Sequence, residues 1–140
     1  LQPLAVQEGQ VRVLVAKAPV KIEALFLRHK TTYRAAYDAA WRAAEAAGAF
    51  DMLFFNAHGE LTEGARSNVF IQQAGLWYTP PLACGLLPGV MRQIMLNDAT
   101  WSAREKVLTM DDLRTAEAVV VCNALRGALP AKVVWPLDSS

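Results

Sequence analysis

The sequence predicts a mixed α/β domain. Short apolar runs rich in β-branched residues alternate unevenly with helix-forming runs along its 140 residues, a pattern that favours mixed α/β over a sandwich or a helical bundle. The length suits one domain. Apolar residues make up 54% of the chain and charged residues 19%, which excludes a solvated disordered chain.

The overall charge and the length of the apolar stretches argue against nucleic acid and membranes as partners. A formal net charge of +1 gives no general attraction to nucleic acid or to an anionic membrane. No apolar stretch approaches the roughly 18–20 residues of a spanning helix, and no signal-peptide pattern is visible. We therefore expect a cytoplasmic protein that binds neither nucleic acid nor a membrane.

Cys84 and Cys122 are predicted to be buried free thiols rather than a disulfide or metal site.

The apolar content exceeds the average for a domain, which indicates either a large core or, since a small domain cannot bury everything, a face that packs against another chain or domain. The sequence starts with Leu1 and an irregular stretch, so we expect a fragment in which residues 1–25 form a linker and the first strand. The alternation of Val11, Val13 and Val15 with other residues predicts that strand at 10–16.

The clearest predicted element is a helix from Thr31 or Thr32 to about Ala47, because eight alanines fill this stretch and its apolar residues fall on one stripe. Gly48 suits a left-handed C-cap. The remaining predicted elements are shorter. They are an apolar stretch at 22–27, strands at 52–57, 60–62, 68–73, 76–79 and 117–122, helices at 90–97 and 111–116, and a strand-rich region at 125–135.

Lys30 follows an apolar run and precedes the predicted helix, with Arg28, His29 and Arg34 nearby. Neighbouring positive charge and desolvation both disfavour the ammonium form, so such an amine can act as a nucleophile near neutral pH. The alternative is a solvated surface charge.

Glu63 comes at the end of a predicted strand, directly before a glycine. A side chain in that place can point into a cavity, where a carboxylate could pair with a protonated ring nitrogen. The alternative is a loop glutamate paired with Arg66.

Two further segments could bind an anion or a polar ligand. At Gly89, Val90 and Met91 a glycine is followed by a helix start, with Pro88 expected in the first turn; free amides there suit a phosphate. Asn123 and Ala124 follow a buried strand, and the Asn123 amide can donate and accept hydrogen bonds. An ordinary helix start and a satisfied turn asparagine are the alternatives.

Taken in order, these segments resemble the C-terminal half of the fold type IV pyridoxal-phosphate enzymes, which include branched-chain aminotransferases, D-amino-acid aminotransferases and 4-amino-4-deoxychorismate lyase. The likeness runs from about residue 26 to 129 and rests on RHKTTYR at 28–34, LTEGARSNVF at 61–70, LPGVMRQ at 87–93 and VCNAL at 121–125. It implies the C-terminal pseudo-barrel domain of the D-amino-acid aminotransferase-like fold.

The resemblance also implies a cofactor, pyridoxal 5'-phosphate, and roles for these residues. Lys30 would hold the cofactor as a Schiff base and later act as general base. Glu63 would keep the pyridine nitrogen protonated. The phosphate would be held around the 89–91 helix start and the 123–124 strand end, and Arg34 would lie near the ring hydroxyl. The cofactor-binding set is Lys30, Arg34, Glu63, Gly89, Val90, Met91, Asn123 and Ala124.

Within the family, VCNAL at 121–125 with Pro130 after it resembles the lyase branch. The implied reaction is elimination of pyruvate from 4-amino-4-deoxychorismate, which leaves 4-aminobenzoate for folate biosynthesis. The His-Lys-Thr-Thr run also resembles lyase domains fused behind aminodeoxychorismate synthase component I. The alternatives are a branched-chain or D-amino-acid aminotransferase, or a degenerate non-catalytic assembly domain.

One departure from the family affects the domain organisation. Family members place the site between two domains, and the N-terminal one supplies a phosphate-binding arginine and part of the substrate wall, whereas only some 25 residues precede the resemblance here. We therefore expect residues 26–140 to be the C-terminal domain with its N-terminal domain missing, the family's homodimeric assembly, and weak or absent activity of the isolated chain.

Overall fold

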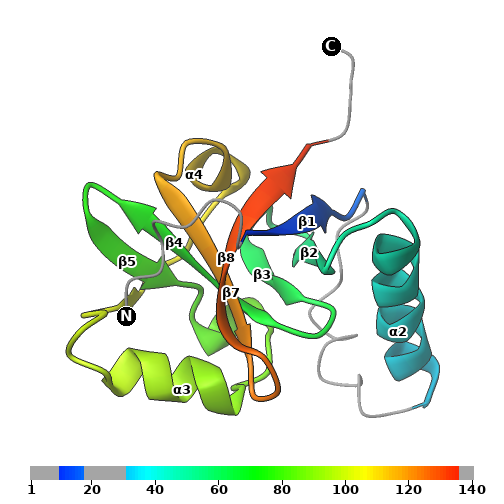
Figure 1. Ribbon diagram of the computed structural model, residues 1–140, viewed down its shortest axis with the longest axis horizontal. Helices are drawn as coiled ribbons and strands as arrows, with labels where there is room; N and C mark the ends of the chain where they lie inside the picture. Colours follow the sequence, from blue (N-terminus) through cyan, green and yellow to red (C-terminus); the bar gives the residue numbers. More distant parts are fainter. Residues whose placement is uncertain (1–9, 18–30, 136–140) are drawn as a thin grey trace.

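The computed structural model describes residues 10–17 and 31–135, which form one eight-stranded sheet with helices packed around it (Figure 1). The strand order across the sheet is β3-β2-β1-β8-β7-β4-β5-β6. The elements are β1 Val11–Val15, α2 Thr31–Ala46, β2 Asp51–Phe55, β3 Leu61–Gly64, β4 Asn68–Gln73, β5 Leu76–Thr79, the 3₁₀ turn η3 Leu82–Cys84, α3 Val90–Asn97, β6 Arg104–Glu105, α4 Met110–Arg114, β7 Ala118–Asn123 and β8 Gly127–Val134.

The sheet mixes both strand directions and curls toward closure. β1 pairs in parallel with β2 and β8, while β7 pairs antiparallel with β8 and β4. The two ends of the strand order approach each other: the Leu61 amide on β3 donates to the Leu108 carbonyl at 2.8 Å, and Glu60 bridges Thr109 just beyond β6. This confirms the mixed α/β class and the pseudo-barrel domain that the resemblance implied.

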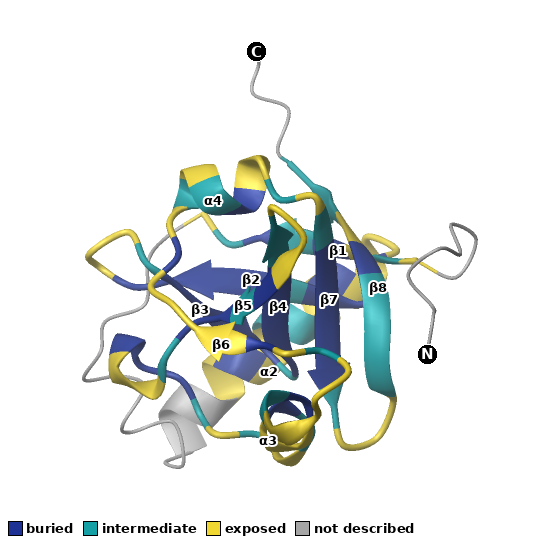
Figure 2. Cartoon of the chain, turned by 90° about the vertical axis from the view of Figure 1, so that its left-hand side faces the viewer, coloured by how far each residue is buried: buried dark blue, intermediate teal, exposed yellow. Residues whose placement is uncertain are grey.

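Alternating side chains of the strands divide the core into an interior cluster and two outer clusters. On β7, Val119 and Val121 belong to the interior cluster, whereas Val120 and Cys122 face outward with Met95 of α3. The period of two along a strand explains this division. Strands β2, β3, β4 and β7 are mostly buried, β8 is half-buried, and the outward side of α3 is exposed (Figure 2).

Helix α2 covers a third apolar cluster, on the part of the sheet around β2. Tyr37 of the helix stacks on Phe54 with ring centroids 4.8 Å apart. The helix ends at Ala46 and Gly48 adopts φ +83°, the left-handed conformation expected of it. Of the predicted apolar stripe, Ala36 is exposed because the helix rests on the sheet through its later turns.

Most of the shorter elements also lie where the sequence predicted them. β4 and β5 match the predicted bounds, as does α3. The expectation that Pro88 lies in the first turn of α3 was wrong: Gly89 is the N-cap, so Pro88 precedes the helix. The predicted stretch at 22–27 and Lys30 lie outside the described residues.

Both cysteines are buried free thiols, as expected. Within the part of the chain that the structure describes, no group of three or more His, Cys, Asp and Glu side chains is arranged to hold a metal ion. Among the same residues, no helix combines the length and apolar character needed to cross a bilayer.

Candidate active site

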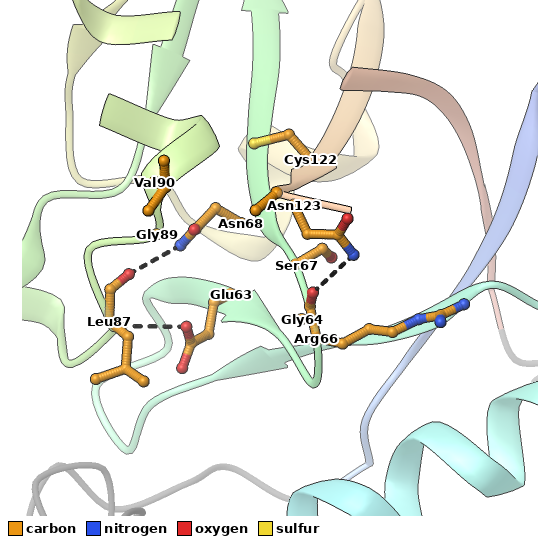
Figure 3. Close-up of a pocket in the computed structure, with 11 residues that line it drawn as sticks. Glu63, Gly64, Arg66, Ser67, Asn68, Leu87, Gly89, Val90, Cys122 and Asn123 are labelled. Atoms are coloured by element: carbon orange, nitrogen blue, oxygen red, sulfur yellow. Dashed lines mark hydrogen bonds between the residues drawn. The ribbon is translucent and has the colours of Figure 1, made fainter. Parts of the chain in front are cut away.

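A cavity of about 240 Å³ opens where the ends of β3, β4 and β7 meet the start of α3 (Figure 3). Most of the residues around it carry polar side chains or exposed backbone groups. They are Glu63, Gly64, Arg66, Ser67, Asn68, Leu87, Gly89, Val90, Cys122, Asn123 and Ala124. Three segments that are distant in the sequence, 63–68, 87–90 and 122–124, thus contribute to one wall.

Two side chains on either side of the connection between β3 and β4 hold the same residue of the loop before α3. Glu63, only 3% exposed, accepts a hydrogen bond at Oε1 from the Leu87 amide at 3.3 Å. Asn68 Nδ2 donates to the Leu87 carbonyl at 3.1 Å. Figure 3 shows both bonds. The loop that leads into α3 is therefore fastened to the sheet through backbone atoms.

The start of α3 supplies N–H groups to this cavity. Gly89 is the N-cap and no side chain caps the helix, so the amides of Val90 and Met91 have no partner within it. A Cβ atom at position 89 would collide with Asn68 Oδ1. Only glycine therefore lets the helix start approach Asn68 this closely, and the positive end of the helix dipole favours an anion there.

Asn123, at the end of β7, connects two turns beside the cavity. Its Nδ2 donates to the Arg66 carbonyl at 3.1 Å, and its Oδ1 accepts from the Arg126 amide at 2.7 Å. The side chain thus ties the β3–β4 turn (residues 64–67) to the turn after β7. Ala124 lines the same cavity.

The β3–β4 turn rests on Asp51, a fully buried residue at the start of β2. Its carboxylate accepts hydrogen bonds from the Met52, Ala65 and Arg66 amides and from Ser67 Oγ. Burial raises the pKa of Asp51 above its ordinary value of 3.8, although these bonds act in the opposite direction.

The Arg66 side chain leaves the cavity. Its guanidinium donates to the Phe50 carbonyl at 3.0 and 3.2 Å and stacks over the rings of Trp41 and Phe50. Figure 3 shows it pointing away from Glu63. The Arg66 guanidinium is therefore engaged with Phe50 and Trp41, and not in the ion pair with Glu63 that the sequence left open as an alternative.

Of the predicted site residues, five line the cavity: Glu63, Gly89, Val90, Asn123 and Ala124. The Met91 side chain packs against the outer cluster at α3, which leaves only its amide for the predicted role. Arg34 lies in the first turn of α2, but its side chain, like Lys30, is outside the described residues.

Sequence reasoning assigned no role to Ser67, Asn68, Leu87 or Cys122, which also line the cavity. Ser67 and Asn68 stand in the 61–70 motif, so buried polar residues next to the predicted carboxylate were the available signal. Burial raises the pKa of the Cys122 thiol to about 12, so this thiol stays protonated near neutral pH.

The described residues suit pyridoxal phosphate. A buried carboxylate can face a protonated ring nitrogen, and uncapped helix amides can hold a phosphate. The absence of a Cβ at Gly89 keeps that cradle open. Lys30, the expected attachment point, lies outside the described residues, so its distance from Glu63 stays a prediction.

Known proteins resemble this chain over most of its length. A protein of Schizosaccharomyces pombe named "Putative aminodeoxychorismate lyase" is 36% identical over 101 residues, covering 70% of this chain and 44% of that protein. A Mesorhizobium loti structure named "Putative amino-acid aminotransferase" is 39% identical, with a TM-score of 0.75 over 89% of this chain and 60% of its own. A Legionella pneumophila structure named "Putative 4-amino-4-deoxychorismate lyase" is 28% identical, with a TM-score of 0.78 over 89% of this chain and 47% of its own.

The chain thus spans 44% of the length of that curated relative. The sequence profile of the family described as amino-transferase class IV, whose enzymes depend on pyridoxal phosphate, matches residues 1–134, nearly the whole chain. The curled sheet has the arrangement expected for that family. This chain belongs to the class IV aminotransferase family.

Proposed function

We propose that this chain is the cofactor-binding part of a pyridoxal-phosphate-dependent lyase that eliminates pyruvate from 4-amino-4-deoxychorismate and leaves 4-aminobenzoate. The observation that carries the proposal is the convergence of Glu63, the uncapped start of α3 and the Asn123 turn on one cavity. The 36% identity to the fission yeast protein favours the lyase branch.

The residues of the site would divide the work of holding the cofactor and moving the proton. Lys30 would carry the cofactor through its amine, Glu63 would hold a proton at the ring nitrogen, and the Val90 and Met91 amides would bind the phosphate. When bound, pyridoxal phosphate supplies a ring that draws electrons from the substrate carbon bearing the amino group. Lys30 Nζ would move the proton from that carbon.

We also propose that the rest of the site comes from an N-terminal domain in a homodimer. The cavity of about 240 Å³ lies below the roughly 300–1,000 Å³ of small-molecule sites. Apart from Arg66, whose guanidinium is engaged elsewhere, no Lys or Arg lines it among the described residues. A further cation for the phosphate would then come from outside them. Light scattering of the complete gene product measures the assembly.

The test is the product formed by the complete gene product loaded with pyridoxal phosphate. We expect pyruvate and 4-aminobenzoate in equal amounts from 4-amino-4-deoxychorismate, and a cofactor absorbance band that Lys30→Ala removes. Glu63→Gln should slow product formation about 100-fold or more. Lys106→Ala is the matched control, because that exposed amine binds Gln73 far from the cavity, and it should change neither readout.

The alternative enzyme is an aminotransferase, which the 39% identity to the Mesorhizobium loti structure favours. Formation of a keto acid only in the presence of an amino acceptor would establish it and refute the lyase. A wild-type protein without any cofactor band would refute both and indicate a non-catalytic assembly domain.

A further inference from the structure

We propose that Asp51 is a positioning residue for this site, because its buried carboxylate holds the β3–β4 turn in the shape that directs Glu63 and Asn68 into the cavity. Asp51 itself does not line the cavity. The inference deepens the proposed function and rests on it in one respect, since it takes the cavity as the place where pyridoxal phosphate binds.

The four hydrogen bonds of Asp51 use both of its oxygens. Oδ1 accepts from the Met52 amide at 2.8 Å and the Ala65 amide at 3.1 Å, and Oδ2 accepts from the Arg66 amide at 3.0 Å and Ser67 Oγ at 2.6 Å. Three of these donors belong to the β3–β4 turn. A carboxylate can accept at all four places, whereas an amide of the same shape can accept at only two.

The turn also fits closely around this carboxylate. A Cβ atom at Gly64 would collide with Asp51 Oδ2, and it would lie 2.7 Å from Ser67 Oγ. The Gly64 amide donates to the Ser67 carbonyl at 2.8 Å and closes the turn. Asp51 therefore fills the space below the turn and binds its N–H groups at the same time.

The turn lies between the two side chains that hold the α3 loop. Glu63 directly precedes it and Asn68 directly follows it, and both bind backbone atoms of Leu87. A shift of the turn would move both side chains and, through Leu87, the approach to the helix start at Gly89. Asp51 thereby influences both the proposed ring-nitrogen contact and the proposed phosphate contact without touching either.

A carboxylate elsewhere in the fold provides a matched control. Glu117 accepts hydrogen bonds from the Ala74 and Gly75 amides of the β4–β5 turn (residues 74–75), both at 3.0 Å. Neither that turn nor Glu117 lines the cavity. Removing its charge perturbs a turn by the same chemistry but at a place unconnected to Glu63 or Asn68.

The experiment compares Asp51→Asn with Glu117→Gln in the complete gene product, well below the unfolding temperature of each variant. Amide hydrogen exchange and the dissociation constant of pyridoxal phosphate are measured. For Asp51→Asn we expect about 10-fold faster exchange at Ala65, Arg66 and Leu87, and about 10-fold weaker cofactor binding. Glu117→Gln should accelerate exchange only in its own turn and leave cofactor affinity unchanged.

Ser67→Ala is the milder variant should Asp51→Asn fail to fold. It removes one donor to Oδ2 and should shift exchange and affinity in the same direction by a smaller factor. Faster exchange at Ala65 and Arg66 with unchanged Leu87 exchange and cofactor affinity would overturn the inference and leave Asp51 a local structural residue. A wild-type protein that binds no pyridoxal phosphate would refute the proposed function, and exchange at Leu87 would still decide the role of Asp51.

Discussion

Two successive turns of the chain, at opposite ends of β4, are each held by a carboxylate, yet their surroundings differ. The β3–β4 turn is bound by the fully buried Asp51, and the β4–β5 turn is bound by the exposed Glu117. Burying a carboxylate is unfavourable unless its hydrogen bonds are complete, whereas an exposed one loses little hydration. A buried carboxylate is thus an unfavourable way to stabilise a turn, and it occurs at the turn beside the cavity.

The two turns differ more in how narrowly their shape is fixed than in how strongly their carboxylates bind them. The buried turn has no room to change: Gly64 touches Asp51, and both flanking residues are engaged with Leu87. The exposed turn has open space around Gly75, so its shape can relax without consequence for the cavity. Substitutions in the two turns should therefore differ in their effects on stability and on binding.

The largest expected difference is between alanine at Gly64 and alanine at Gly75. Gly64→Ala forces a Cβ into the Asp51 carboxylate and should lower the free energy of unfolding by about 3 kcal/mol. Gly75→Ala meets no atom but must adopt φ +80°, which should lower it by about 1 kcal/mol. Urea denaturation of the two variants measures both values, and equal losses would contradict the contrast drawn between the turns.

A second prediction concerns pH. Because burial raises the pKa of Asp51, the folded state takes up a proton on this carboxyl group more readily than the unfolded chain does, and the stabilisation that comes from this proton uptake is lost as the pH rises from about 3.8 through the folded-state pKa. Asp51→Asn should therefore destabilise the protein more at low pH than at neutral pH. Burial also acts on Asp112, but bonds from Thr109 and Gln73 outweigh it and lower the pKa of Asp112.

The stability that Asp112 contributes is present above 3.8 and lost as the pH falls through its folded-state pKa. Asp112→Asn should therefore destabilise the protein more at neutral pH, the opposite sign to Asp51→Asn. Thermal or urea unfolding of both variants between about pH 2.5 and pH 7 tests the signs, because the window of Asp112 lies below 3.8 and that of Asp51 above it. The same pH trend in the two variants would refute the assignment.

The smallest expected effect concerns the two cysteines, whose thiols should react slowly with an alkylating reagent in the folded protein. Burial raises the pKa of Cys122 to about 12 and that of Cys84 to about 11, with Glu60 adding to the rise at Cys84. At pH 8 about one Cys84 thiol in 1,000 is ionised, and fewer at Cys122. Iodoacetamide should label neither in the folded protein and both after unfolding, as mass spectrometry would show. Rapid labelling of Cys122 would mean that the wall beside the β3–β4 turn is looser than described.

The fold was predictable where local signals were strong. Alanine density and Gly48 predicted α2, and the two runs on either side of Ala74 and Gly75 predicted β4 and β5. Pro88 was misplaced because proline before a helix fits more than one position, and the neighbouring Gly89 took the N-cap. The meeting of the sheet edges at Leu61 and Leu108 depends on pairing between distant segments, which periodicity does not report.

The residues that line the site were predictable from sequence motifs, but the residue that holds them in place was not. Glu63, Gly89 and Asn123 could be singled out because each stands at the end of a strand or the start of a helix. Asp51 gave no such signal, since an acid at the start of a strand resembles a surface residue. Its partners lie 14 to 16 positions later in the chain and are visible only after β2 and β3 have paired.

The hold on Leu87 has a consequence for how this loop can diverge. Glu63 and Asn68 bind its amide and its carbonyl, so neither bond depends on the side chain at that position. Other amino acids could make both bonds and keep the start of α3 at the same distance from the β3–β4 turn, proline excepted because it lacks the amide hydrogen. Sequence drift at position 87 is therefore compatible with an unchanged position of the helix start, while the side chain at that position can alter the cavity that it lines.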